Sequence, residues 1–125
     1  MSSLLIVDDD EAVRDTLLDL FSDNHLCHGA PTVETALSFL EVETYDVVLT
    51  DISMPGLSGV ELLGIIRQRQ PETPVIIISG ISDPAHAEGL IKLGAFDYIL
   101  KPFRLEQIEA SVARAVEHRR LARQG

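Results

Sequence analysis

Five short apolar runs recur along the chain, and a segment with helical character follows each of them. The first, third and fourth runs are continuous rather than alternating, as expected of strands that are covered on both faces. The second run is the weakest, because Cys27, His28 and Gly29 interrupt it. The predicted strands occupy residues 4–7, 26–30, 47–49, 75–78 and 98–100.

Four of the five segments that follow these runs carry apolar residues at intervals of three or four positions, which predicts amphipathic helices. Ser58 and Glu61 have the spacing of a capping box at a helix start. Asp83 and Pro84 suit the cap and first residue of another helix, and Gly94 suits its end. The helically spaced residues are Val13, Leu17, Leu20, Phe21, Val33, Ala36, Leu37, Leu40, Leu62, Leu63, Ile66, Leu105, Ile108, Val112 and Val116.

Strands that alternate with helices require crossover connections, so the pattern predicts a mostly parallel sheet of five strands in a three-layer α/β/α sandwich. The 125 residues suit one domain, and 46% hydrophobic with 24% charged residues is an ordinary globular mixture. No apolar run approaches the roughly 18 residues of a membrane span. The single cysteine, Cys27, forms no internal disulfide and is expected to be an inert, half-buried thiol. Together with an N-terminus that lacks a secretory signal, it favours a reducing cytoplasm.

The charge is distributed unevenly. Residues 1–113 carry 6 basic and 19 acidic side chains, whereas residues 114–125 carry four arginines and one glutamate. So acidic a body repels nucleic-acid phosphate, and we expect no direct contact with nucleic acid. We predict a domain over residues 1–118, with residues 119–125 as the end of its last helix or the beginning of a linker.

Polar residues directly follow four of the predicted strands. The carboxyl ends of parallel strands are where sites collect in such sheets, so these residues are expected to share one edge. Two carboxylates about 4 Å apart repel by roughly 4 kcal/mol at an effective dielectric near 20. Either the pKa values of some of these carboxyl groups rise, or a cation that prefers oxygen ligands, such as Mg²⁺, sits among them. Capping of the following helix is the alternative reading of the acidic run. The residues are Asp8, Asp9, Asp10, Asp51, Ser79 and Lys101.

Four motifs contain these residues, in order and at the ends of alternating strands. Together they make essentially the whole chain resemble the receiver domain of two-component response regulators. The resemblance implies a flavodoxin-like sheet with strand order 2-1-3-4-5. The motifs are Leu5-Ile6-Val7-Asp8-Asp9, Leu49-Thr50-Asp51-Ile52-Ser53-Met54-Pro55-Gly56, Ile78-Ser79-Gly80, and Leu93-Gly94-Ala95-Phe96-Asp97-Tyr98 leading to Lys101-Pro102-Phe103.

The resemblance also implies a phosphoacceptor site. Asp51 would take a phosphoryl group from a sensor histidine kinase or a phosphotransfer protein. Asp8, Asp9, Asp51 and the backbone carbonyl of Ser53 would hold Mg²⁺ or Mn²⁺. Lys101 would pair with Asp51 and then with the phosphoryl group. The domain would catalyse only its own phosphorylation and dephosphorylation, and it would not otherwise be an enzyme.

A switch is implied beside this site. Ser79 would donate a hydrogen bond to the phosphoryl group, and Tyr98 would move inward in response. The alternative is that Ser79 only satisfies a backbone amide at the strand end and that Tyr98 is only a half-buried strand aromatic. The surface of the fourth helix, fifth strand and fifth helix would then signal to an effector domain or output protein, with dimerisation on phosphorylation. Serine lacks the methyl group of the threonine more common there, so we expect a looser switch. The Lys101–Pro102 bond is expected to be cis.

Other readings of the chain are weaker. A flavodoxin-like electron carrier would need a phosphate-binding first loop, but Asp8 to Glu11 repels phosphate. A degenerate receiver would lack some of the site residues, all of which are present. A phosphatase with an aspartate nucleophile would usually have a second acid two residues on, where this chain has Ser53. The four histidines have no metal-binding spacing, and solvent exposure is expected for each: His25, His28, His86 and His118.

Overall fold

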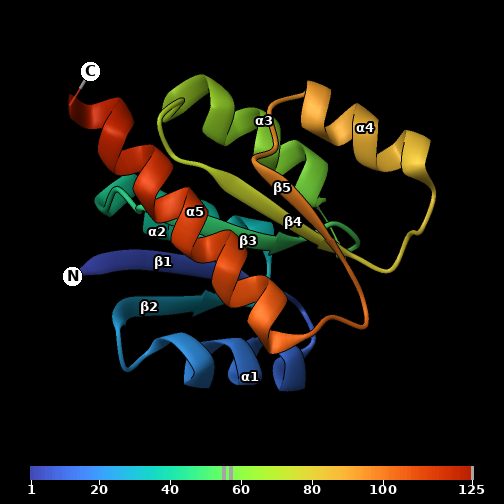
Figure 1. The fold of residues 1–125 in the computed structure, drawn as a ribbon, viewed down its shortest axis with the longest axis horizontal. Helices are drawn as coiled ribbons and strands as arrows, with labels where there is room; N and C mark the ends of the chain where they lie inside the picture. The colour runs from blue at the N-terminus through green and yellow to red at the C-terminus, as the bar shows by residue number, and fades with distance from the viewer. Residues whose placement is uncertain (55, 57, 125) are drawn as a thin grey trace.

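The computed structural model describes residues 1–54, 56 and 58–124. Within them, five parallel strands form one sheet in the order β2-β1-β3-β4-β5 (Figure 1). The predicted flavodoxin-like order 2-1-3-4-5 is therefore confirmed. The strands are β1 (Ser2–Val7), β2 (His25–Ala30), β3 (Val47–Asp51), β4 (Val75–Ser79) and β5 (Asp97–Leu100).

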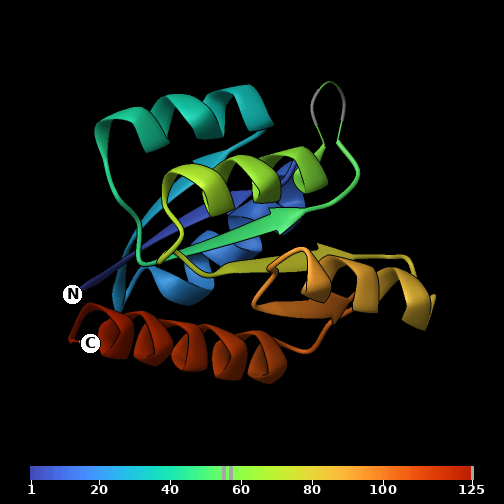
Figure 2. The ribbon, with the colours of Figure 1, turned by 90° about the horizontal axis from the view of Figure 1, so that it is seen from above.

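Helices cover both faces of the sheet, which confirms the three-layer sandwich (Figure 2). α2, α3 and α4 pack on one face, and α1 and α5 pack on the other. The helices are α1 (Glu11–Phe21), α2 (Val33–Val42), α3 (Gly59–Arg69), α4 (Pro84–Lys92) and α5 (Leu105–Gln124).

The continuous apolar runs follow from this double coverage. In β1, Leu5 and Val7 face the core under α2, α3 and α4, while Leu4 and Ile6 face the core under α1 and α5. Successive strand residues point to opposite faces, so a strand between two helical layers needs apolar residues at every position. The middle strands β3 and β4 are buried along their whole length.

The helix boundaries follow the predicted capping signals. Ser58 and Glu61 form the capping box of α3, and Asp83 accepts a hydrogen bond at the start of α4, before Pro84. Gly94 follows α4 with φ of 109°, a left-handed conformation that favours glycine. β1 begins at Ser2, two residues before the apolar run, because backbone pairing with β2 continues to this point.

Three of the four histidines are less exposed than expected, because neighbouring residues partly cover them. His28 Nδ1 lies 2.6 Å from the hydroxyl of Tyr45, which is completely buried. Burial raises the pKa of Tyr45 to about 12, with the charge of Glu43 adding to the effect. Aromatic neighbours also partly cover His25 and His86, whereas His118 is exposed.

Two further expectations concern burial and hydropathy. Cys27 is partly buried on the edge strand β2, and burial raises the pKa of its thiol, as expected of an unreactive cysteine. Among the described residues, no helix has both the length and the apolar character that crossing a membrane requires.

Candidate functional site

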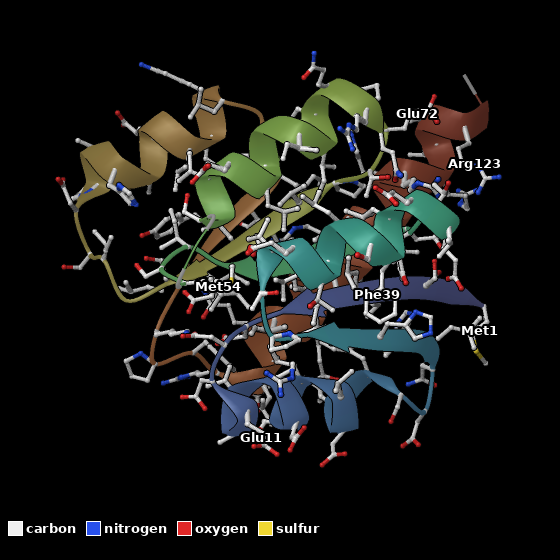
Figure 3. The ribbon with its side chains drawn as sticks, turned by 180° about the vertical axis from the view of Figure 1, so that it is seen from behind. Met1, Glu11, Phe39, Met54, Glu72 and Arg123 are labelled. Carbon is white, nitrogen blue, oxygen red and sulfur yellow. The ribbon has the colours of Figure 1, made fainter. Side chains whose placement is uncertain are left out.

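The predicted site residues meet at the carboxyl edge of the sheet. Asp8 and Lys101 directly follow β1 and β5, while Asp51 and Ser79 are the last residues of β3 and β4. The backbone N–H of Lys101 donates to the Ser79 carbonyl at 2.7 Å, which ties the end of β5 to β4. In Figure 3, Met54 marks this end of the molecule, and Met1 and Arg123 mark the opposite end.

Three carboxylates form a cluster at this edge. Asp8, Asp9 and Asp51 each offer a carboxylate oxygen, and these oxygens all lie within 4.8 Å of one another. Asp8 and Asp51 are only 1% and 8% exposed, whereas Asp9 is open to solvent. Hard oxygen donors that leave one side accessible to water suit Mg²⁺, which keeps several waters when it is bound by proteins. The cluster therefore fits the predicted divalent cation.

Lys101 lies between two of these acids. Its Nζ atom is 3.4 Å from Asp8 Oδ2 and 3.3 Å from Asp51 Oδ2. Burial opposes the charge of this ammonium group, but Asp8 and Asp51 together raise its pKa above the usual value. Lys101 is thus a fixed positive charge beside Asp51 at neutral pH.

Burial has the opposite consequence for Asp8. Removal from water raises the pKa of its carboxyl group, and the neighbouring charge of Asp51 adds to the effect. The Asp10 N–H, which donates to Asp8 Oδ1 at 2.9 Å, and the charge of Lys101 both oppose it. The negative charge of Asp8 is therefore unfavourable in this buried position, and a bound cation would stabilise it.

The acidic run divides into two roles. Asp10 caps α1, because its Oδ1 accepts the N–H of Ala12 at 2.9 Å. The capping alternative is therefore correct for Asp10, while Asp8 and Asp9 join the carboxylate cluster. Sequence reasoning missed Arg14, whose Nη1 donates to the Asp8 carbonyl at 2.7 Å. The position of Arg14, one helical turn after Asp10, could have indicated this contact from the sequence.

Asp51 is oriented by its own loop and by Lys101. Its Oδ1 accepts the Ile52 N–H at 2.7 Å, and its Oδ2 faces Lys101. Ser53 follows on the loop, with its N–H 3.5 Å from Asp51 Oδ1. Metal ligation by the Ser53 carbonyl stays a prediction. Pro55, the proline of the predicted motif, lies outside the described residues.

The side chains of Ser79 and Tyr98 both form hydrogen bonds with the backbone of Ile81. The Ser79 hydroxyl oxygen accepts the Ile81 N–H at 3.1 Å, and the Tyr98 hydroxyl donates to the Ile81 carbonyl at 2.6 Å. Ser79 is completely buried, and the Tyr98 ring is half-buried with its centroid 5.9 Å from that of His86. The sequence gives no signal for this link, because it passes through backbone groups. The Lys101–Pro102 bond is cis, as expected.

A doubly wound α/β sheet in the order 2-1-3-4-5 has the fold of a receiver domain, and acids, a hydroxyl and a lysine lie together at its carboxyl edge. The family model of the response regulator receiver domain matches residues 4–113, and the chain belongs to this family.

Similar proteins include both longer regulators and isolated domains. The DNA-binding transcriptional regulator NtrC of Klebsiella pneumoniae is 41% identical over 90% of this chain but only 24% of its own length. The chain thus spans about a quarter of the curated relatives that it matches. A response regulator receiver domain protein of Clostridium thermocellum has a TM-score of 0.90 at 30% identity, covering 98% of this chain and 99% of its own. The BeF₃-activated DrrB receiver domain has a TM-score of 0.87 at 31% identity, covering 94% of this chain and 98% of its own.

Proposed function

We propose that this receiver domain signals through phosphorylation of Asp51 by a sensor histidine kinase or a phosphotransfer protein. The observation that carries the proposal is the placement of the Asp51 carboxylate. One oxygen lies 3.3 Å from the Lys101 ammonium group, and the carboxylate belongs to the cluster with Asp8 and Asp9. A nucleophile between a fixed cation and a cation site suits attack on an anionic donor.

The reaction needs little covalent chemistry from the protein. An Asp51 carboxylate oxygen forms a bond to the phosphorus of the phosphohistidine, and the phosphorus–nitrogen bond breaks with its electron pair passing to the imidazole. The product is an aspartyl phosphate on this chain and a free histidine on the partner. When bound by Asp8, Asp9, Asp51 and the Ser53 carbonyl, Mg²⁺ or Mn²⁺ supplies positive charge for the phosphoryl oxygens.

Lys101 would neutralise further charge as the phosphoryl group arrives. In the unphosphorylated protein its ammonium group pairs with Asp8 and Asp51. Once Asp51 has become an acyl phosphate, the same ammonium group is within reach of a phosphoryl oxygen. The exchange keeps Lys101 paired at every stage, so its desolvation is never left uncompensated.

Ser79 and Tyr98 would convert this event into a change of surface. The Ser79 oxygen accepts a bond from Ile81, so its own O–H remains available to donate to a phosphoryl oxygen. Movement of Ser79 would break its hydrogen bond with the Ile81 N–H. Because the Ile81 carbonyl accepts the hydrogen bond of the Tyr98 hydroxyl, a shift of Ile81 would also affect Tyr98. A charge-assisted hydrogen bond contributes roughly 1.5–3 kcal/mol, enough to shift an equilibrium by one to two orders of magnitude. The output would appear on the α4–β5–α5 surface.

The same reasoning leads to proposals for the bounds of the domain, its location and its partners. Residues 1–118 would form the receiver and residues 119–125 the end of its last helix or a linker, leading to an effector domain or acting on an output protein. The excess of acidic residues disfavours direct nucleic-acid binding by this domain. A cytoplasmic location suits a partner of histidine kinases, and we expect dimerisation on phosphorylation.

Incubation with acetyl phosphate tests the proposal directly. With Mg²⁺, intact-mass spectrometry should show the addition of one phosphoryl group, and excess EDTA should prevent it. Asp51→Asn should abolish the modification. Asp83→Asn is the matched control, since Asp83 lies outside the cluster and asparagine also caps helices well. An unmodified wild-type protein in Mg²⁺, or undiminished labelling of Asp51→Asn, would refute the assignment.

A further inference from the structure

Gly59, the first residue of α3, packs against the end of β3 that carries Asp51. Gly59 is buried, and its N–H donates to the Ile52 carbonyl at 3.1 Å. A Cβ atom at this position would lie 2.2 Å from the Asp51 carbonyl oxygen and 2.9 Å from Ile52 Cα. Both are backbone atoms, which cannot rotate away as the end of a side chain can. Any residue but glycine must therefore displace α3 or the Asp51 peptide.

The contact does not arise from the backbone conformation of Gly59. Among the described glycines, only Gly56 and Gly94 have positive φ, so alanine could adopt the dihedral angles of Gly59. The capping box also does not require glycine, because it joins Ser58 and Glu61 through their own side chains and N–H groups. The requirement at position 59 is therefore one of space beside Asp51.

Movement of the Asp51 peptide would move its carboxylate. The carbonyl oxygen that faces Gly59 also accepts the hydroxyl of Thr50 at 2.9 Å, so it is held from two sides. The N–H of Ile52 belongs to the same peptide group and donates to Asp51 Oδ1 at 2.7 Å. A tilt of this peptide would shift the carboxylate relative to Lys101, which lies 3.3 Å from Oδ2.

We propose that Gly59 is a positioning residue for phosphoryl transfer. By lacking a side chain, it allows α3 to begin directly against the Asp51 peptide, and this contact sets the approach of the carboxylate to Lys101 and to the Asp8–Asp9 pair. The inference rests on the proposed role of Asp51 as phosphoacceptor.

Gly64→Ala provides a matched control within the same helix. A Cβ atom at Gly64 would meet nothing within 4 Å, and the residue is exposed. We expect Gly64→Ala to be phosphorylated by acetyl phosphate at the wild-type rate. Gly59→Ala should react about 10- to 100-fold more slowly at saturating Mg²⁺, since a misplacement near 1 Å has costs of this order. Ile66→Val is a second control, because it loses core packing in α3 and should retain the wild-type rate.

Two measurements separate positioning from general damage to the fold. In amide NMR spectra of the unphosphorylated protein, Gly59→Ala should shift the Asp51, Ile52 and Lys101 signals, whereas Gly64→Ala should not. Thr50→Val keeps the side-chain shape but removes the hydroxyl on the same carbonyl, so it should also slow phosphorylation. If Gly59→Ala does not fold, Thr50→Val decides the matter.

The outcomes distinguish this inference from the proposed function. Wild-type phosphorylation together with an equally fast, folded Gly59→Ala would overturn the role of Gly59 alone. A wild-type rate in Thr50→Val would do the same where Gly59→Ala is unfolded. A wild-type protein that takes up no phosphoryl group would instead overturn the proposed function of Asp51.

Discussion

Lys101 Nζ lies 3.3 Å from Asp51 Oδ2, although β5, which Lys101 follows, and β3, which ends at Asp51, are not neighbours. β4 separates β5 from β3, so the lysine side chain reaches across the end of a strand to the acid. Its stem is partly buried along the way, and its ammonium group ends between Asp8 and Asp51.

Replacing Lys101 with methionine should remove this charge while retaining most of the aliphatic stem. We expect phosphorylation by acetyl phosphate to slow by about 100-fold, the order found when one charge-stabilising donor is removed from an active site. Lys92→Met on the exposed part of α4 is the control and should react at the wild-type rate. Equal rates for the two variants would argue against a role of Lys101 in transfer.

The same variant should also be less stable at neutral pH. The pKa of Lys101 is raised in the folded protein. The pairing of its ammonium group therefore stabilises the fold below the usual pKa of lysine, and this stabilisation is lost as the pH rises through the pKa of the folded state. Urea unfolding of Lys101→Met at pH 7 should therefore give a lower midpoint than that of the wild type. The difference should shrink in strongly alkaline solution.

Asp8→Asn should stabilise the metal-free protein. The pKa of Asp8 is raised, mainly by burial, so the favourable contribution of this group is present below its unfolded pKa near 3.8 and lost as the pH rises through the folded value. Thermal melts in EDTA at pH 7 should give a higher melting temperature for the variant than for the wild type. The gap should close as the pH falls toward 4, and Mg²⁺ binding by the variant should be far weaker. A lower melting temperature for Asp8→Asn at pH 7 would contradict the prediction.

Tyr98→Phe should uncouple the surface from phosphorylation. The change removes the bond from the tyrosine hydroxyl to the Ile81 carbonyl, a loss of about 0.5–1.5 kcal/mol. NMR should show that acetyl phosphate still modifies the variant but shifts the amides of α4 and β5 less than in the wild type. Tyr45→Phe is the matched control, since it also loses a hydroxyl contact, to His28, but leaves Ile81 untouched. Equal changes of the amide chemical shifts in both variants would show that Tyr98 takes no part in the switch.

Two adjacent arginines of α5 should differ in their effect on stability. Arg119 is 7% exposed and pairs with Asp46, whose other oxygen accepts the Ser3 N–H at 2.7 Å. Arg119→Gln should lower the free energy of unfolding by about 1–3 kcal/mol, because it leaves a half-buried carboxylate without its cation. Arg120 forms an exposed pair with Glu117, so Arg120→Gln should leave the free energy of unfolding nearly unchanged. Urea titrations with matched slopes would measure both, and similar losses would contradict the difference in burial.

Side-chain pattern was sufficient to predict the strands, the helix caps and the clustering of polar residues at one edge. The apolar runs locate β1, β3 and β4 because both faces of these strands are buried. The edge strand β2 is the weakest in the pattern because its side chains are less completely covered. The strand order came from the resemblance to receiver domains, since crossovers leave no trace in hydrophobic periodicity.

Contacts that involve backbone groups could not be predicted from the pattern of side chains. Arg14 binds the carbonyl of Asp8, Ser79 and Tyr98 meet at the two polar groups of Ile81, and Gly59 lies against the carbonyl of Asp51. Each depends on how a loop or helix end packs on the sheet, which residue type alone does not encode. The partial covering of His28 likewise depends on Tyr45, a residue that the helix and strand patterns do not connect to it.

Met1 and Arg123, which lie near the two termini, are far from the carboxylate cluster. Figure 3 shows both residues at one end of the molecule and Met54, from the loop that follows Asp51, at the other. A fluorescent reporter or an affinity tag fused next to Met1 or Arg123 would therefore lie away from the carboxylate cluster. We expect immobilised or labelled forms of the domain to react with acetyl phosphate at the rate of the untagged protein.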